Sequence, residues 1–419
     1  MQLIYIILFI VSLIYIIFRK IDLLSLGIAS FMIYHIYALE GYVFIHSRIR
    51  NNLLLYSSDI IDELYVMLIL QLLILISITL FYDYITKKSN KSLFTFQRSL
   101  NKKGVYISFV ILGIISLFYY AIDIMQVGVH NISGNKSQVW ERVGTFYVFS
   151  LWTSMALFAY AINEKKYYLL LIALPPILIH FYIGSRPFFV VLVIISILYY
   201  GKFLKRKYIK RAKLYTFSLL ALFFVMIYRQ IYANKNDISL RYLYELFTNP
   251  ESYEKVLRFG EARIVLANYN YILESKFSLE IMDIFSRFIS FIPYANRLVD
   301  SPNNLLLSSI IRNKLNADYG LASNFWVEGY AMFGYIGILF FTIVWGVILA
   351  YSNKYIYSKN WNSYFILPFV VYIGFYIHRM DFTKVIGNAK FLIFSAIIWW
   401  IINSVITRNW TISYKKIKY

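Results

Sequence analysis

The chain contains no cysteine among its 419 residues, so disulfide bonds, a thiolate nucleophile and a thiolate metal site are all excluded. Acidic residues are scarce as well, with 21 Asp and Glu against 42 Lys and Arg. The sequence also lacks a Gly-x-Gly-x-x-Gly motif, a Walker loop and a Gly-x-Ser-x-Gly elbow, which leaves ATP-driven transport and serine hydrolysis without support. No spacing of His, Asp and Glu indicates a metal site, and we predict neither a metal nor a cofactor.

Apolar residues make up 60% of the chain. They occur in runs of roughly 15 to 20 residues, close to the length that crosses a bilayer as a helix. Uninterrupted Ile, Leu and Phe runs suit helices rather than the alternating strands of a membrane barrel. We therefore predict an all-α, polytopic transmembrane helix bundle. About eleven spans are expected, near residues 2–18, 21–39, 63–82, 104–122, 145–162, 167–183, 187–201, 214–228, 325–351, 363–378 and 388–406.

Basic residues are concentrated in alternate connections between these spans. One set of connections holds 23 basic and three acidic residues, whereas the other set is close to neutral. The positive-inside rule makes the basic set cytoplasmic, so we predict a multi-pass protein of the cell inner (cytoplasmic) membrane, with its N-terminus outside and its C-terminus in the cytoplasm. The net charge of +21 then reflects topology and attraction to anionic membrane lipids, and no nucleic-acid partner is expected. The first span lacks a positively charged start and a small-residue cleavage site, so we expect a retained helix.

The expected spans divide the chain into three parts. Residues 1–228 hold transmembrane helices 1 to 8, residues 229–324 form one large extracytoplasmic (periplasmic) loop, and residues 325–419 hold transmembrane helices 9 to 11. A connection of this length is usually functional or carries structure of its own. Two stretches of the loop, near 253–275 and 279–292, have apolar residues at helical spacing and are bounded by prolines. We interpret them as helices lying on the membrane.

Arginines gather on the side that is predicted to face outward. The tight turn Gly184-Ser185-Arg186-Pro187 sets a guanidinium at the membrane boundary, where a fixed charge is costly unless it meets an anion. The alternative interpretation is that the Arg186 side chain extends to the lipid headgroups. The large loop has more arginines than lysines, and the planar arginine fork suits phosphate recognition. Ordinary pairing with loop carboxylates is the other interpretation, as with Glu254 and Arg258 at i, i+4 spacing. The loop arginines are Arg229, which directly follows a span, and Arg241, Arg258, Arg263, Arg287, Arg297 and Arg312.

Three residues are candidates for a catalytic base. Glu328 lies at the expected outer start of a span, where an ionised group is expensive unless it is paired or lines a wet cavity. Asp381 and His378 lie in His378-Arg379-Met380-Asp381-Phe382, a short turn between two hydrophobic stretches. A structural ion pair between Asp381 and Arg379 remains an alternative, and a lone helical histidine is more often a packed polar residue than a ligand.

The order of these motifs resembles the bacterial oligosaccharide repeat-unit polymerases, the Wzy-type O-antigen and capsule polymerases of the lipid-carrier pathway. The resemblance rests on four motifs between residues 180 and 385: the Gly184-Ser185-Arg186 turn, the stretch Arg258-Phe259-Gly260-Glu261-Ala262-Arg263, the segment from Ser323 to Gly337 with Glu328 and Phe333-Gly334-x-x-Gly337, and the Arg379-x-Asp381-Phe382 turn. The family usually carries glycine after the arginine of the first turn, where this chain has Pro187.

The resemblance implies an inverting, metal-independent glycosyltransferase of polysaccharide (lipopolysaccharide or capsule) biosynthesis. It would move a growing glycan from polyprenyl (undecaprenyl) diphosphate onto the non-reducing end of a lipid-linked repeat unit. Arginines in place of a metal would stabilise the leaving diphosphate, and a carboxylate or histidine would take the acceptor proton. The implied diphosphate-binding residues are Arg186, Arg258, Arg263, Arg379 and Arg229; the implied catalytic residues are Glu328 first, then Asp381 or His378.

Other functions remain open from the sequence. An O-antigen ligase shares the outer arginines and the large loop, and differs only in its acceptor. A lipid-oligosaccharide flippase or transporter would need charges through the middle of the membrane, and these are nearly absent from the expected spans. A membrane acyltransferase would favour a histidine or aspartate near the cytoplasmic side, where Lys and Arg prevail. Expected partners are undecaprenyl-diphosphate-linked oligosaccharide, membrane lipids and a chain-length regulator protein.

Overall fold

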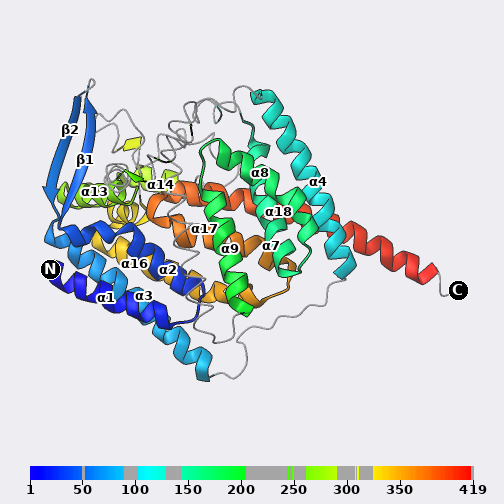
Figure 1. Ribbon diagram of the computed structural model, residues 1–419, viewed down its shortest axis with the longest axis horizontal. Helices are drawn as coiled ribbons and strands as arrows, with labels where there is room; N and C mark the ends of the chain where they lie inside the picture. The colour runs from blue at the N-terminus through cyan, green and yellow to red at the C-terminus, as the bar shows by residue number, and fades with distance from the viewer. Residues whose placement is uncertain are drawn as a thin grey trace. The chain divides into compact units, whose positions relative to one another are not determined.

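The computed structural model describes residues 1–49, 52–88, 102–128, 143–203, 261–289 and 324–416, together with residues 139, 239, 244, 248, 249, 307, 309 and 310. Figure 1 shows the chain with its helices and strands labelled. It divides into two compact units. The first unit comprises Met1–Lys91, Met226–Asn353 and Ile373–Gly387, and the second comprises Ser92–Val225, Lys354–Tyr372 and Asn388–Tyr419.

Helices occupy the predicted spans wherever the structure describes them, and the predicted span near 214–228 lies outside the described residues. Within those residues, five helices are long and apolar enough to cross a bilayer: α3, α4, α7, α16 and α18. The all-α, polytopic membrane fold is therefore confirmed. The helices are α1 (Gln2–Phe18), α2 (Leu23–Tyr34), α3 (Asp62–Lys88), α4 (Lys102–Val127), α7 (Thr145–Asn163), α8 (Leu170–Tyr182), α9 (Pro187–Phe203), α16 (Phe325–Tyr357), α17 (Trp361–Tyr376) and α18 (Phe382–Lys416).

The first unit also contains a two-stranded sheet that the sequence did not predict. Strands β1 (Tyr42–Ile49) and β2 (Asn52–Asp59) pair antiparallel, with Tyr42 opposite Asp59. They follow the short 3-10 helix η1 (Ile36–Glu40), which ends at Gly41 with φ of +84°, a conformation that glycine adopts without strain. This hairpin fills a connection that the positive-inside rule places outside, and it leaves the helical fold class unchanged.

Two described helices lie in the large loop, α13 (Glu261–Glu274) and α14 (Ile281–Ile289). They fall within the two stretches predicted to be helical, so the prediction of a partly helical loop is confirmed. Helix α13 packs against α2, η1 and β1, while α1, α2 and α3 lie side by side (Figure 1). The first unit thus joins the N-terminal helices to the part of the loop that carries α13.

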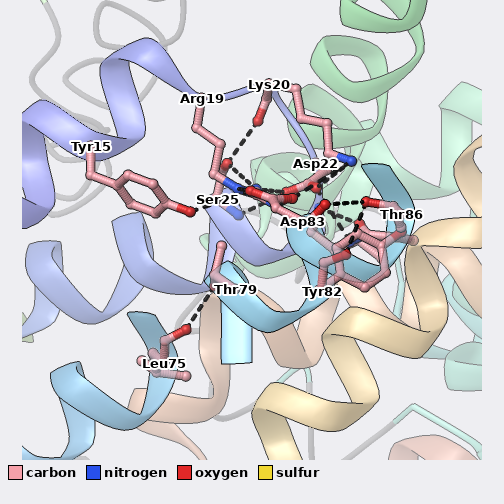
Figure 2. Close-up of polar contacts among 12 residues, drawn as sticks. Tyr15, Arg19, Lys20, Asp22, Ser25, Leu75, Thr79, Tyr82, Asp83 and Thr86 are labelled. Atoms are coloured by element: carbon pink, nitrogen blue, oxygen red, sulfur yellow. Dashed lines mark hydrogen bonds and ion pairs between the residues drawn. The ribbon is translucent and has the colours of Figure 1, made fainter. Parts of the chain in front are cut away.

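An ion-pair network fastens one end of α1, α2 and α3 together (Figure 2). Arg19 follows the last residue of α1, and its Nε and Nη2 donate to the two carboxylate oxygens of Asp83 on α3, each at 2.8 Å. Its Nη1 donates to Asp22, before α2, and to Ser25 Oγ at 2.7 Å. Burial lowers the pKa of the Arg19 guanidinium, but Asp83 and Asp22 outweigh it and raise that pKa above its usual range.

The carboxylate of Asp22 also begins α2 and reaches α16. One Asp22 oxygen accepts from Ser25 N at 3.0 Å, which caps the helix N-terminus. The other accepts from Asn353 Nδ2 at 3.3 Å, and Asn353 Oδ1 accepts from Leu23 N at 2.8 Å. The side chains of Arg19, Asp22 and Asn353 are all buried, so the network fixes four helices at the end that the predicted topology places at the cytoplasm.

In the second unit α7 packs against α4, α8 and α9, and α8 also contacts α4 and α9. Ser116 Oγ of α4 donates to the carbonyl of Ser150 on α7 at 3.2 Å, and Ser150 Oγ donates back to the Ser116 carbonyl at 2.9 Å. Such reciprocal bonds join helices that cannot use the hydrophobic effect against lipid.

Candidate active site

Helix α16 is broken at the Phe333-Gly334-x-x-Gly337 motif. Phe333 and Gly334 have non-helical backbone angles, and Gly334 has φ of +63°, which glycine adopts without the strain of a side chain. A Cβ at Gly337 would lie 2.0 Å from the Gly329 carbonyl oxygen, although residues eight apart in a straight helix are separated by about 12 Å along its axis. The two glycines therefore let two backbones touch across the break.

The segment before the break folds back along the segment after it. The Phe325 and Phe341 ring centroids lie 4.7 Å apart, and those of Trp326 and Trp345 lie 5.3 Å apart. Phe325 lies against Phe341 and Gly329 against Gly337, so the partner number falls as the residue number rises, which is an antiparallel arrangement. Residues 325–332 therefore form a half-helix beside the first turns of the long one. Glu328 consequently lies in the half-helix, ~7.5 Å along its axis before Phe333, where the break begins. Glu328 was expected at the outer start of a span, and the structure adds that it lies in the half-helix that precedes the break at Phe333 and Gly334.

The turn between α17 and α18 meets this half-helix. The 3-10 helix η5 (Ile377–Arg379) follows α17 directly, and α18 starts at Phe382. The Phe382 ring stacks on Phe341 at 6.2 Å and contacts Phe325 at 6.0 Å. The turn therefore packs beside the broken helix, and it brings Asp381 and His378 into the same part of the first unit as Glu328.

The centre of the site is a buried cluster of charges. The Glu328 carboxylate forms an ion pair with Arg287 of α14, with Arg287 Nε 2.8 Å from Glu328 Oε1 and both side chains fully buried. The other Glu328 oxygen accepts a hydrogen bond from the Phe382 backbone N–H. Asp381 is equally buried, and Lys384 Nζ lies 3.3 Å from its Oδ2. Two carboxylates, a guanidinium and an ammonium thus gather where three elements meet.

Arg287 is the residue that sequence reasoning missed. In the sequence it is one of the seven loop arginines and belongs to none of the four motifs, whereas Glu328 and Asp381 are candidate bases. A signal was present in the sequence: Arg287 interrupts the run Ile281-Met282-Asp283-Ile284-Phe285-Ser286-Arg287-Phe288-Ile289, and a charge within an apolar segment beside a membrane needs a partner.

His378 lies in an aromatic enclosure next to this cluster. Trp326 Nε1 donates to His378 Nδ1 at 3.0 Å, and His378 Nε2 lies 3.3 Å from Ser30 Oγ on α2. Because Nδ1 accepts, the ring is neutral with its proton on Nε2. Both ring nitrogens have protein partners, so this geometry favours a role in positioning Trp326. The rings of Phe31, Tyr34, His35, Trp326 and Trp345 surround the imidazole.

Arg263 of α13 forms a second charged contact in the first unit. Its Nη2 donates to Glu40 Oε2 at 2.6 Å, and its guanidinium carbon lies 4.4 Å from the centre of the Tyr37 ring. Arg263 is buried, and its carboxylate partner Glu40 is one-third exposed.

The remaining predicted arginines are placed in different parts of the chain. Arg379 is half-buried in η5 of the first unit. Arg186 is half-buried in the second unit. In the same turn Gly184 has φ of +94°, and Pro187 is the first residue of α9, a position that proline favours. Arg229 and Arg258 lie outside the described residues. Among the residues that the structure describes, no group of three His, Asp or Glu is arranged to hold a metal ion.

Long apolar helices, a helical insertion in the large loop and a buried centre of carboxylates and arginine define a polytopic membrane protein with a polar site inside its helix bundle. The chain matches the family model described as O-antigen polysaccharide polymerase Wzy over residues 1–409, so it belongs to that family. It is therefore a membrane polymerase of the glycosyltransferase type that acts on lipid-linked oligosaccharide repeat units in polysaccharide biosynthesis. No curated protein and no solved structure matches it.

Proposed function

We propose that the protein transfers a growing glycan from undecaprenyl diphosphate onto the non-reducing end of a lipid-linked repeat unit, at the outer face of the inner membrane. The observation that carries this proposal is the buried Glu328 carboxylate, held between Arg287 and the Phe382 N–H inside the bundle. The N-terminus would be outside and the C-terminus cytoplasmic, as the distribution of basic residues predicts. A chain-length regulator would be the protein partner.

Glu328 is the proposed base. It takes the proton of the acceptor hydroxyl while that oxygen attacks the anomeric carbon, and the bond from that carbon to the diphosphate oxygen breaks with its electrons leaving on undecaprenyl diphosphate. Attack opposite the leaving group inverts the anomeric centre. Asp381, buried beside Glu328, is the second candidate, and His378 is the third because both of its nitrogens are already bonded. Arg287 positions Glu328.

Arginines are proposed to hold the diphosphate, whose negative charge grows as the bond breaks. Several guanidiniums give the electrostatic stabilisation that a divalent cation supplies in other glycosyltransferases, so the reaction would be independent of metal. Arg263 and Arg379 are the described candidates in the first unit, and Arg263 would exchange its Glu40 contact for the phosphate. Arg186, Arg229 and Arg258 complete the proposed set.

The test is a Glu328→Gln variant, which is nearly isosteric and has no carboxylate. In cells that lack the native protein, surface glycan should fall from a ladder to a single repeat. The comparison is made at matched membrane levels of the two proteins, because Gln also leaves the buried Arg287 without its anion. Glu274→Gln, at an exposed end of α13, is the matched control and should keep the ladder. A full ladder with Glu328→Gln would exclude Glu328 as the base.

A cell-free assay separates polymerase from ligase and flippase. Purified protein in bilayers should lengthen the lipid-linked repeat unit when that substrate is the only glycan present. Transfer that needs a lipid-A core would indicate a ligase, and movement across the bilayer with no change in glycan length would indicate a flippase.

A further inference from the structure

Helix α14 has its apolar and charged faces reversed relative to a helix packed against a protein in water. Ile281, Met282, Phe285 and Phe288 are 83%, 70%, 58% and 45% exposed, whereas Arg287 is completely buried. The four apolar residues follow i, i+1, i+4, i+7 spacing and so form one face. Arg287 lies nearly opposite. A helix with this pattern is stable where the medium on its outer side is hydrocarbon.

Three contacts fix where α14 lies. Leu279 N, just before the helix, donates to the Ala331 carbonyl at 2.7 Å. Arg287 pairs with Glu328, and the Phe288 ring contacts Phe382 at 5.3 Å. Glu328 and Ala331 are three residues apart and so lie on the same face of the half-helix. Helix α14 therefore lies against the side of the half-helix and not against its end at the break.

The exposed apolar surface of α16 is the one expected to face lipid, because α16 is long and apolar enough to cross a bilayer. Ile336, Phe340, Ile343 and Val347 of this spanning helix are exposed and follow i, i+4, i+7, i+11 spacing, which is one helix face. Ile336 and Phe340 lie in the same turns of α16 that pack against residues 325–332. The apolar face of α14 is therefore at the depth where α16 already exposes large apolar side chains.

We propose that the apolar face of α14, formed by Ile281, Met282, Phe285 and Phe288, binds the hydrocarbon chains of bilayer lipids, and that this contact holds Arg287 on Glu328. Membrane hydrocarbon is the occupant because the face carries no charged side chain and lies at the depth where the spanning helix α16 exposes its own large apolar side chains. Removing α14 from lipid would draw Arg287 away from Glu328. The active site is thereby covered on one side by a helix that is held both by its protein contacts and by lipid on its outer face.

The absence of cysteine allows a direct test of the lipid contact. Phe285→Cys is labelled with a nitroxide in bilayers of phosphatidylethanolamine and phosphatidylglycerol, and its collision rates with oxygen and with a water-soluble nickel chelate are compared. Oxygen concentrates in hydrocarbon and the chelate stays in water. Matched controls are Ile336→Cys on the lipid-facing surface of α16 and Glu274→Cys at the exposed end of α13.

The label at residue 285 should follow the Ile336 label, with oxygen collisions exceeding chelate collisions several-fold. A label at 285 that behaves like the one at residue 274 would overturn the lipid contact, as would a label shielded from both agents. A shielded label would show that protein covers this face. These outcomes depend on no assumption about the reaction.

The second part of the proposal, the hold on Arg287, rests on the proposed function and is tested by activity. Phe285→Asn with Phe288→Asn should reduce the ladder to a single repeat at normal membrane levels, whereas Phe285→Leu with Phe288→Leu should keep it. A full ladder from the Asn pair would overturn this part, provided that Glu328→Gln loses the ladder. If Glu328→Gln keeps it, the proposed base fails while the nitroxide result stands.

Discussion

The ion pair between Arg287 and Glu328 leads to a prediction that separates stability from catalysis. Both side chains are 0% exposed and their nearest atoms are 2.8 Å apart. Arg287→Met keeps the unbranched stem of the side chain and removes the charged guanidinium, which leaves the Glu328 carboxylate buried without its cation. Breaking a buried pair by removing one partner typically costs about 3–5 kcal/mol, so we expect the free energy of unfolding to fall by about that amount.

A second change should restore most of this stability. In Arg287→Met with Glu328→Gln neither side chain is charged, and replacing both members of a buried pair by neutral groups of similar volume is often close to neutral. The double variant should therefore unfold within about 1 kcal/mol of the native protein. Polymerisation should be absent from both variants, because the proposed base is gone in one and has lost its positioning residue in the other.

Unfolding can be followed by intrinsic tryptophan fluorescence in detergent. Trp326 and Trp345 are buried beside the site, so their emission reports on the segment that carries Glu328. The reasoning would be refuted if Arg287→Met were as stable as the native protein, or if the losses of the two single variants simply added in the double variant. Additivity would mean that the two charges do not interact.

Two further predictions concern the rest of the first unit. Arg19→Ala should lower the free energy of unfolding by about 3–5 kcal/mol, because it strips the buried Asp22 of its cation; Lys20→Ala should cost less than about 1 kcal/mol, because Lys20 is 43% exposed and its carboxylate contacts are at 3.9 Å. Thermal unfolding of the two variants, side by side, checks this, and equal losses would contradict it. Gly337→Ala, whose Cβ would lie 2.0 Å from the Gly329 carbonyl oxygen, should abolish the ladder and cost about 1–3 kcal/mol or more, whereas Gly387→Ala, with nothing within 4 Å, should do neither.

The positions of the helices could be predicted from the sequence because each apolar run specifies its own helix. In lipid, every backbone polar group must be satisfied within the segment, so a run such as 2–18 or 145–162 forms a helix whatever its neighbours are. The structure has α1 at Gln2–Phe18 and α7 at Thr145–Asn163. The β1–β2 hairpin was not predictable in this way, since its strands depend on pairing with each other.

The break in α16 could not be predicted from the length of an apolar run. Residues 325–351 form one apolar run, and hydropathy does not distinguish a straight helix from a hairpin of two helices. What decides the structure is Gly329 lying against Gly337, a close approach between backbones that a single sequence does not reveal. Arg287 was missed for a related reason: its partner lies 41 residues further along the chain, on the half-helix that this break creates.

The turn between α17 and α18 gives residue 328 a structural role as an oxygen acceptor, apart from any role in catalysis. Irregular backbone inside a membrane protein must have its polar groups satisfied by the protein or by water, and Glu328 accepts the hydrogen bond from the N–H of Phe382, at the start of α18. Gln at this position keeps an oxygen acceptor for that N–H, whereas Ala removes it. If the carboxylate is the base, Glu328→Gln should fold and be inactive, and Glu328→Ala should be both inactive and less stable. Equal stability of the two variants would show that the Phe382 N–H has another partner.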